Sequence, residues 1–271
     1  MKLDPAMIAM DLDDTLLKHD LSISDRTVDT LKKASERGIK LVLASGRSPE
    51  AMIPYARRIG VDRVQSWLVC NNGSEIITSD TGERIYERRL PEEVALEAYR
   101  LVLAAGLSCH VYENNVIHVS RETEYSRRDC MLSGLKPIVP EDYENLIRRG
   151  VYKLVIPGDP EYIVPVEAEF KVIFKDRATV FVSKPYFLEI LPFGAGKGEA
   201  LAYLAAEKLG VTSERVMAFG DSMNDESMIR YAGMSVAMSN SRPEILALAK
   251  HVTDLDNDAD GLADFIEKTV L

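Results

Sequence analysis

The sequence predicts an α/β protein with a parallel-sheet core and an inserted α+β domain. Short apolar runs alternate with amphipathic segments at both ends of the chain, which is typical of parallel strands joined by crossover helices. The middle of the chain shows partly alternating runs between helical segments, which indicates a separate α+β unit. We therefore expect a core formed by residues 1–82 and 191–271, with the inserted domain over residues 83–190.

The N-terminal part of the core is bounded by recognisable helix signals. Ser24 can cap the first helix, and Gly38 supplies its left-handed end. Ser48, followed by proline at the first helical position, opens the second helix. The expected elements are a strand over 7–10, a helix over 24–37, a strand over 39–44, a helix from 48, a strand over 67–70 and a turn over 71–73.

The same alternation returns near the C-terminus. There we expect a helix over 198–209, strands over 216–219 and 235–237, and helices over 243–250 and 262–268. In the inserted domain, partial alternation predicts strands over 111–119, 152–156 and 179–182.

Composition excludes several classes of protein. The formal net charge of −10 argues against a general nucleic-acid binder, because such proteins need a basic surface. The three cysteines have no CxxC spacing, so we expect reduced, buried thiols instead of disulfides or a zinc cluster. No apolar run approaches the roughly 18 residues that cross a bilayer. We therefore expect a cytoplasmic protein without nucleic-acid or membrane partners.

Chemically competent residues follow three of the expected strands. They are Asp11 and Asp13, then Ser45 and Gly46, then Asp221, Asn224 and Asp225. Because the carboxyl ends of parallel strands share one edge of a sheet, these residues predict one site. If the Asp11 and Asp13 carboxylates lay about 4 Å apart, they would repel by roughly 4 kcal/mol at an effective dielectric of 20. A divalent cation bound between them would offset this repulsion. Taken alone, residues 11–15 are equally consistent with an acidic turn.

These motifs resemble, in type and order, the four motifs of the haloacid dehalogenase superfamily. The matching segments are Asp-Leu-Asp-Asp-Thr at 11–15, Ser45, Lys197 and Gly-Asp-Ser-Met-Asn-Asp at 220–225. The inserted segment, with residues 232–238 and 260–261, resembles the Cof-type phosphatases, which carry a large α/β cap between the second and third motifs. The resemblance implies a Rossmann-like core and a Mg²⁺-dependent phosphatase that acts on small phosphorylated metabolites. Sugar phosphates are the leading candidates for its substrates.

The resemblance also implies residue roles. Asp11 would attack phosphorus and form an aspartyl-phosphate, and Asp13 would serve as general acid and base. A dehalogenase proper would lack this second aspartate, so Asp13 favours phosphoryl transfer. Magnesium would be held by Asp221, one Asp11 oxygen and the Asp13 backbone carbonyl. The groups expected to hold or orient the phosphate are the Leu12 and Gly46 amides, Ser45, Lys197 and Asn224, with Asp225 in support.

The remaining polar residues have either two possible roles or a purely structural one. Arg47 contacts substrate or pairs with an acidic residue, and Asn72-Gly73 is a structural turn, because glycine permits a positive φ. The four histidines show no ligand spacing. Substrate selection is expected in the cap, where the polar candidates are Tyr112, Glu113, Asn114, Arg121, Arg127, Arg128 and Lys184, with His110 and His118 weaker.

Two alternatives to a phosphatase remain at this point. A phosphosugar mutase uses the same two aspartates and returns the phosphoryl group to a second hydroxyl. A non-catalytic module would keep the fold and bind a phosphorylated ligand without turnover.

Overall fold

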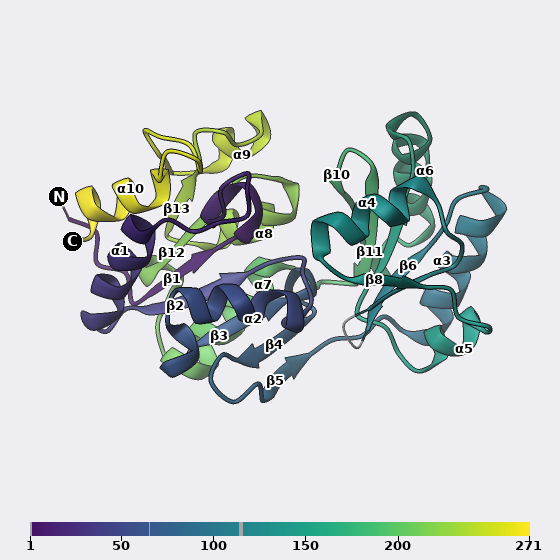
Figure 1. The fold of residues 1–271 in the computed structure, drawn as a ribbon, viewed down its shortest axis with the longest axis horizontal. Helices are drawn as coiled ribbons and strands as arrows, with labels where there is room; N and C mark the ends of the chain where they lie inside the picture. The colour runs from purple at the N-terminus through teal and green to yellow at the C-terminus, as the bar shows by residue number, and fades with distance from the viewer. Residues whose placement is uncertain (1, 65, 114–115) are drawn as a thin grey trace. The chain divides into compact units, whose positions relative to one another are not determined.

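The computed structural model describes residues 2–64, 66–113 and 116–271, without the side chain of Leu132. Two compact units are present, Met1–Tyr86 with Gly196–Leu271 and the inserted Glu87–Ala195 (Figure 1). The units change over at 86/87 and 195/196, a few residues beyond the boundaries set from the sequence at 82/83 and 190/191. Strand pairing accounts for both shifts, because β5 (Arg84–Glu87) still belongs to the core sheet and β11 (Phe187–Pro192) still belongs to the inserted sheet.

The core sheet has eight strands in the order β14-β13-β12-β1-β2-β3-β4-β5. The pairs from β14 to β3 are parallel, and β4 runs antiparallel to β3. Besides β5, the strands are β1 Met7–Met10, β2 Lys40–Ala44, β3 Trp67–Cys70, β4 Glu75–Thr78, β12 Val216–Gly220, β13 Met234–Ala237 and β14 His251–Val252. The parallel sheet with crossover helices confirms the predicted fold class of the core.

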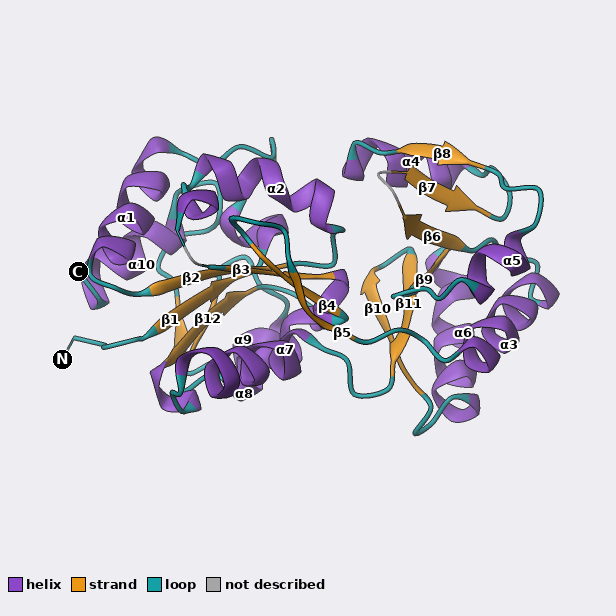
Figure 2. Ribbon diagram, turned by 90° about the horizontal axis from the view of Figure 1, so that it is seen from below, coloured by secondary structure: helices purple, strands orange, loops and turns teal. Residues whose placement is uncertain are grey.

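Helices cover both faces of this sheet, as Figure 2 shows. Ile8 and Met10 of β1 face the side of α1 (Asp25–Glu36), α2 (Pro49–Arg58) and α10 (Gly261–Thr269). Met7 and Ala9 face the side of α7 (Lys197–Tyr203) and α8 (Glu226–Tyr231), and α9 (Pro243–Leu248) packs against α8. Burial on both faces explains why the central strands are continuously apolar.

Local signals explain the helix ends. Ser24 caps α1 as predicted, its Oγ accepting a hydrogen bond from the Thr27 amide at 3.1 Å. Gly38 follows that helix with φ of +86°. The helix predicted over 198–209 is shorter, because α7 ends at Tyr203 and a π-helical turn, Leu204–Leu209, completes the segment.

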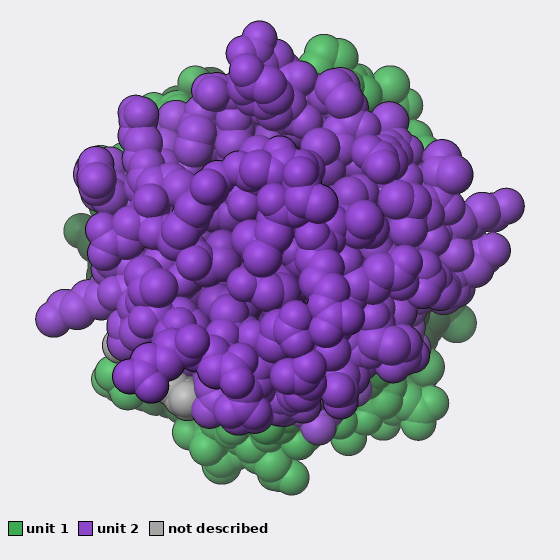
Figure 3. All heavy atoms as spheres, turned by 90° about the vertical axis from the view of Figure 1, so that its right-hand side faces the viewer, with its two compact units in different colours: residues 1–86, 196–271 green, residues 87–195 purple. Residues whose placement is uncertain are grey.

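The inserted unit is built on a six-stranded sheet in the order β10-β11-β9-β6-β7-β8. Its strands are β6 His110–Glu113, β7 Val116–Val119, β8 Lys136–Ile138, β9 Leu154–Pro157, β10 Ala178–Lys184 and β11 Phe187–Pro192. Its helices are α3 Glu92–Ala104, α4 Glu124–Ser133, α5 Tyr143–Arg148 and α6 Pro160–Ile173. The α3, α5 and α6 helices share one apolar core with the sheet, so the unit buries its own interior. Figure 3 shows one outer face of this unit in purple. This unit confirms the predicted α+β insertion.

One strand prediction is wrong. The segment 111–119 contains two strands, β6 and β7, which pair antiparallel so that Tyr112 lies opposite Ile117. The alternating pattern continues through both strands and therefore does not reveal the reversal between them. Cys70 and Cys109 are buried and Cys130 is partly buried, and all three are free thiols. No helix in the described part of the chain is long and apolar enough to span a bilayer.

Candidate active site

Except for Lys197, the predicted functional side chains follow β12, β1 and β2, three adjacent strands at the centre of the core sheet. Asp11 extends β1, its amide donating to the Phe219 carbonyl at 3.0 Å. Ser45 extends β2 in the same way, its amide donating to the Val69 carbonyl at 2.9 Å. The chain leaves β1 toward β2 on one side and later returns at β12 on the other. Such a switch point is where open α/β sheets bind ligands.

Three buried carboxylates and one buried ammonium form the centre of the site. Carboxylate oxygens of Asp11, Asp221 and Asp225 all lie within 4.8 Å of one another. Lys197, fully buried at the start of α7, donates from Nζ to Oδ1 of Asp11 and to Oδ1 of Asp225, each at 2.6 Å. One ammonium therefore faces three carboxylates, which leaves excess negative charge when all are ionised.

The pKa values of these groups reflect that imbalance. Burial, and then the charge of Asp225, raises the pKa of Asp11 to about 7, although Lys197 opposes the shift. Burial, followed by Asp225 and Asp11, raises the pKa of Asp221 well above its usual range. Burial alone would lower the pKa of Lys197, but the two carboxylates it contacts raise it. Lys197 therefore stays charged.

The chemistry of this donor set fits Mg²⁺. Magnesium prefers oxygen ligands, and a divalent cation would supply the positive charge that Lys197 alone does not. Both Asp225 oxygens already accept hydrogen bonds, Oδ1 from Lys197 and Oδ2 from the amides of Asp221 and Ser222 at 2.9 and 3.1 Å. Asp11 and Asp221 are therefore the side chains best suited to hold an ion, and Asp225 fixes the groups around them.

Thr15 is a site residue to which the sequence analysis assigned no role. Its Oγ1 donates to Asp221 Oδ1 at 2.9 Å, and both side chains are buried. The chain reaches this position through the turn Leu12–Leu16, in which Asp14 adopts a left-handed φ of +59°. The only signal for Thr15 in the sequence is its place in the 11–15 motif.

Asp13 lies outside the three-carboxylate cluster. Its Oδ2 accepts from Arg47 Nε at 3.0 Å, and its Oδ1 accepts from Arg47 Nη2 at 2.6 Å. Asp13 contributes no carboxylate to that cluster, because β1 ends at Met10 and the chain turns, but its charge is close enough to help raise the pKa of Asp11. Arg47, left open between substrate contact and ion pairing, makes an ion pair with Asp13.

The groups predicted to bind phosphate lie on the loops after these strands. Leu12 is the first residue of the turn after Asp11 and is fully buried. Ser45 is also buried, and its Oγ accepts from the Arg47 amide at 3.2 Å. Gly46 follows Ser45 directly. Asn224 lies in the short turn Met223–Asp225, where its Oδ1 accepts from Ser222 Oγ at 2.6 Å.

The turn Asn71–Gly73 connects these loops. The Asn72 amide donates to the Ser45 carbonyl at 2.9 Å, and Asn72 Oδ1 accepts from Asn224 Nδ2 at 3.3 Å. Asn72 itself is buried with φ of +54°. A Cβ at Gly73 would lie 2.1 Å from the Gly196 carbonyl oxygen, directly before Lys197. The turn is structural as predicted, but sequence reasoning missed that Asn72 joins the loops after β2 and β12.

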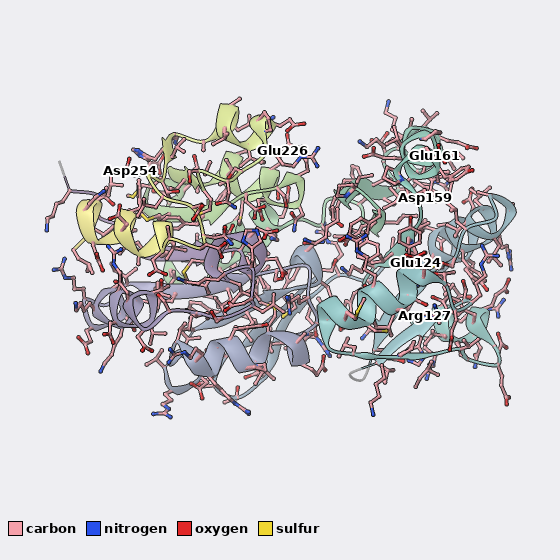
Figure 4. The ribbon with its side chains drawn as sticks, turned by 45° about the horizontal axis from the view of Figure 1, so that its top comes forward. Glu124, Arg127, Asp159, Glu161, Glu226 and Asp254 are labelled. Atoms are coloured by element: carbon pink, nitrogen blue, oxygen red, sulfur yellow. The ribbon has the colours of Figure 1, made fainter. Side chains whose placement is uncertain are left out.

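The histidines do not enter this site. His19 is exposed and bonded to Asp258, whereas His110 is fully buried, with Nδ1 2.8 Å from Asp129 Oδ2. His110 therefore packs inside the inserted unit. Among the cap candidates, Tyr112 donates to the same Asp129 oxygen at 2.6 Å, and Arg127 is exposed on α4 (Figure 4). Asn114 lies outside the described residues.

Comparisons with known proteins place this geometry in a family. The family model described as haloacid dehalogenase-like hydrolase matches residues 8–266. An Enterobacter protein (strain 638) named HMP-PP phosphatase is 29% identical over 246 residues, which cover 91% of this chain and 88% of that protein.

Two solved structures extend the comparison. A haloacid dehalogenase-like hydrolase from Bacteroides thetaiotaomicron is 36% identical, with a TM-score of 0.86 over 97% of this chain and 98% of that one. TM0651 from Thermotoga maritima is 27% identical, with a TM-score of 0.82 over 98% of this chain and 97% of that one. The chain therefore belongs to the haloacid dehalogenase-like hydrolases.

Proposed function

We propose that this protein is a Mg²⁺-dependent phosphatase that hydrolyses small phosphorylated metabolites, first of all sugar phosphates, through an aspartyl-phosphate on Asp11. One observation carries the proposal: Asp11 lies at the sheet switch point, bonded to Lys197 and clustered with Asp221 and Asp225. A buried carboxylate beside a fixed ammonium suits nucleophilic attack on phosphorus. The relative named HMP-PP phosphatase supports a small phosphorylated substrate.

In the first half-reaction, a carboxylate oxygen of Asp11 attacks phosphorus. The new bond joins that oxygen to phosphorus while the bond from phosphorus to the leaving alcohol oxygen breaks. The Asp13 carboxyl group gives its proton to that alcohol oxygen, which leaves as a neutral alcohol. Asp13 is then ionised, and the phosphoryl group is bonded to Asp11.

In the second half-reaction, a water molecule attacks the same phosphorus atom. Asp13 takes a proton from this water, and the bond between Asp11 and phosphorus breaks. Inorganic phosphate leaves, Asp11 is again a carboxylate and Asp13 is again protonated. The net change is hydrolysis of one phosphate ester.

The remaining groups stabilise charge on the oxygens of phosphate that are not transferred. Lys197, the Ser45 hydroxyl and the Leu12 and Gly46 amides supply donors for these oxygens, and Asn224 orients the loop beside them. Magnesium, held by Asp11, Asp221 and the Asp13 carbonyl, would add positive charge at the phosphoryl group when bound.

Substrate selection is assigned to the inserted domain, residues 83–190 in the sequence-based division. Polar side chains there, among them Arg121, Arg128 and Lys184, are candidates to contact the part of the substrate that does not react. Remote contacts of this kind raise specificity without altering the chemistry at phosphorus.

Phosphate release from a panel of sugar phosphates and other phosphorylated metabolites, with and without Mg²⁺, tests the proposal. We expect steady release that requires Mg²⁺ and is lost in Asp11→Asn. Isomerised sugar phosphate without net phosphate release would identify a mutase instead. A Mg²⁺- and ligand-dependent thermal shift without turnover on any substrate would indicate a binding module.

A further inference from the structure

We infer that Arg47 is a positioning residue that holds the Asp13 carboxyl group in the orientation for proton transfer to the leaving alcohol. The inference rests on the proposed function, in which Asp13 is the general acid. It assigns to Arg47 a role in leaving-group departure and not in binding the phosphoryl group.

The contact between the two side chains has the geometry of a fork. Arg47 Nε and Nη2 each donate to a different Asp13 oxygen, at 3.0 and 2.6 Å. A two-point contact of this kind fixes the plane of the carboxylate as well as its position. A lysine at this position would offer a single charged point and would not fix the plane of the carboxylate.

Arg47 is itself held from several directions. Its amide donates to Ser45 Oγ at 3.2 Å, and its carbonyl accepts from the Asn71 amide at 2.9 Å. Its guanidinium carbon lies 5.4 Å from the centre of the Tyr55 ring on α2. The Arg47 side chain is only 12% exposed. The guanidinium is therefore a fixed reference point and not a mobile surface charge.

Asp13, in contrast, lies in a turn, and the contact with Arg47 helps to fix the orientation of its carboxyl group. The next residue, Asp14, has φ of +59°, and the Asp13 side chain is 32% exposed. Proton transfer requires the acid oxygen to lie within hydrogen-bond reach of the leaving oxygen. Without the fork, the Asp13 carboxyl group would lose the two contacts that set its plane, and fewer of its orientations would be productive.

The competing role for Arg47 is direct contact with the phosphoryl group. Substrates with different leaving groups distinguish this role from the positioning role. An alkyl leaving group, such as the alcohol of a sugar phosphate, needs a proton when the ester bond breaks. p-Nitrophenolate leaves readily without one. A residue that positions the general acid therefore matters for alkyl phosphates and little for p-nitrophenyl phosphate, whereas a phosphoryl-binding residue matters equally for both.

The experiment measures kcat/KM for the full-length protein with Mg²⁺ on p-nitrophenyl phosphate and on the best sugar phosphate of the panel. For Arg47→Ala and Arg47→Lys we expect a 10- to 100-fold loss on the sugar phosphate and less than a threefold loss on p-nitrophenyl phosphate. Asp13→Asn should show the same selectivity. Adding Arg47→Ala to Asp13→Asn should cause no further selective loss, because the two residues act as one unit.

Arg57→Ala is the matched control, because Arg57 is exposed on α2 and should change neither rate. Circular dichroism of Arg47→Lys, which keeps the charge, checks that the fold persists. Equal losses on both substrates, or no loss on either, would overturn the inference while leaving the proposed function intact. If Asp13→Asn itself lacks the selectivity, the general-acid assignment fails and the inference fails with it.

Discussion

At the scale of single residues, the site depends on which group neutralises which carboxylate. Lys197 donates hydrogen bonds to Asp11 and Asp225, and Arg47 donates to Asp13. In this set of contacts, Asp221 accepts only from the Thr15 hydroxyl, which carries no charge. Asp221 is thus the least compensated of the four, in agreement with its raised pKa. This imbalance is the strongest physical argument for a cation at this position.

Removing the Thr15 hydroxyl should weaken Mg²⁺ binding. Thr15 orients Asp221 through a 2.9 Å hydrogen bond, and residues that orient metal ligands typically contribute 10- to 100-fold in affinity. We expect Thr15→Ala to raise the Mg²⁺ dissociation constant by about 10-fold or more, measured by calorimetry. Thr15→Ser keeps the hydroxyl and should stay within about threefold of the wild type. Equal Mg²⁺ affinity in the two variants would contradict the assigned contact.

The identities of the site residues were predictable, but their pairings were not. Asp11, Ser45 and Asp221 follow apolar runs, and the carboxyl ends of adjacent parallel strands meet at one edge. The pairing of Asp13 with Arg47 depends on the turn after β1. That turn includes a left-handed aspartate, for which periodicity gives no signal. The roles of these residues in catalysis remain predictions.

At the scale of elements, the turn Asn71–Gly73 determines how closely the loops of the site approach one another. Gly73 has φ of +90°, and its missing side chain leaves room for the Gly196 carbonyl, next to Lys197. A glycine in the sequence indicates only that a positive φ is allowed. The close approach of a segment more than 100 residues away along the chain required the structure.

Gly73→Ala should destabilise the protein more than Gly82→Ala. Both glycines have positive φ, +90° and +70°, so both substitutions add backbone strain of about 1–2 kcal/mol. Only at Gly73 would the added Cβ collide with backbone, because nothing lies within 4 Å of a Cβ at Gly82. Urea unfolding should therefore show the larger loss in the free energy of unfolding for Gly73→Ala. Equal losses would show that the loop relaxes without strain.

At the scale of the whole molecule, each unit has its own apolar interior. Residues from α1, α2 and α10 pack on one face of the core sheet, and the inserted unit buries a separate cluster around α3, α5 and α6. The sequence indicated this division through a change of pattern. It did not indicate β4, β5 and β14 of the core sheet or β8 and β11 of the inserted sheet. Of these, β14 and β8 are short edge strands, which carry weak signals.

Magnesium should stabilise the core unit selectively, and the single tryptophan reports on that unit. Trp67 is buried in β3 of the core sheet, and the inserted unit contains no tryptophan. At 100 times its dissociation constant, Mg²⁺ should raise the free energy of unfolding by about 2.7 kcal/mol. We expect the fluorescence transition to move to higher temperature with Mg²⁺ and to stay unchanged in Asp221→Asn. A shift that persists in this variant would place the ion elsewhere.

The most direct test of the account is covalent labelling of Asp11. The protein is mixed with ³²P-labelled substrate and Mg²⁺, quenched in acid within one turnover, and digested to locate the label. We predict label on the peptide that contains Asp11, released by hydroxylamine as expected for an acyl phosphate, and none in Asp11→Asn. Turnover without labelled protein at any quench time, or label that persists in Asp11→Asn, would contradict an aspartyl-phosphate mechanism at this residue.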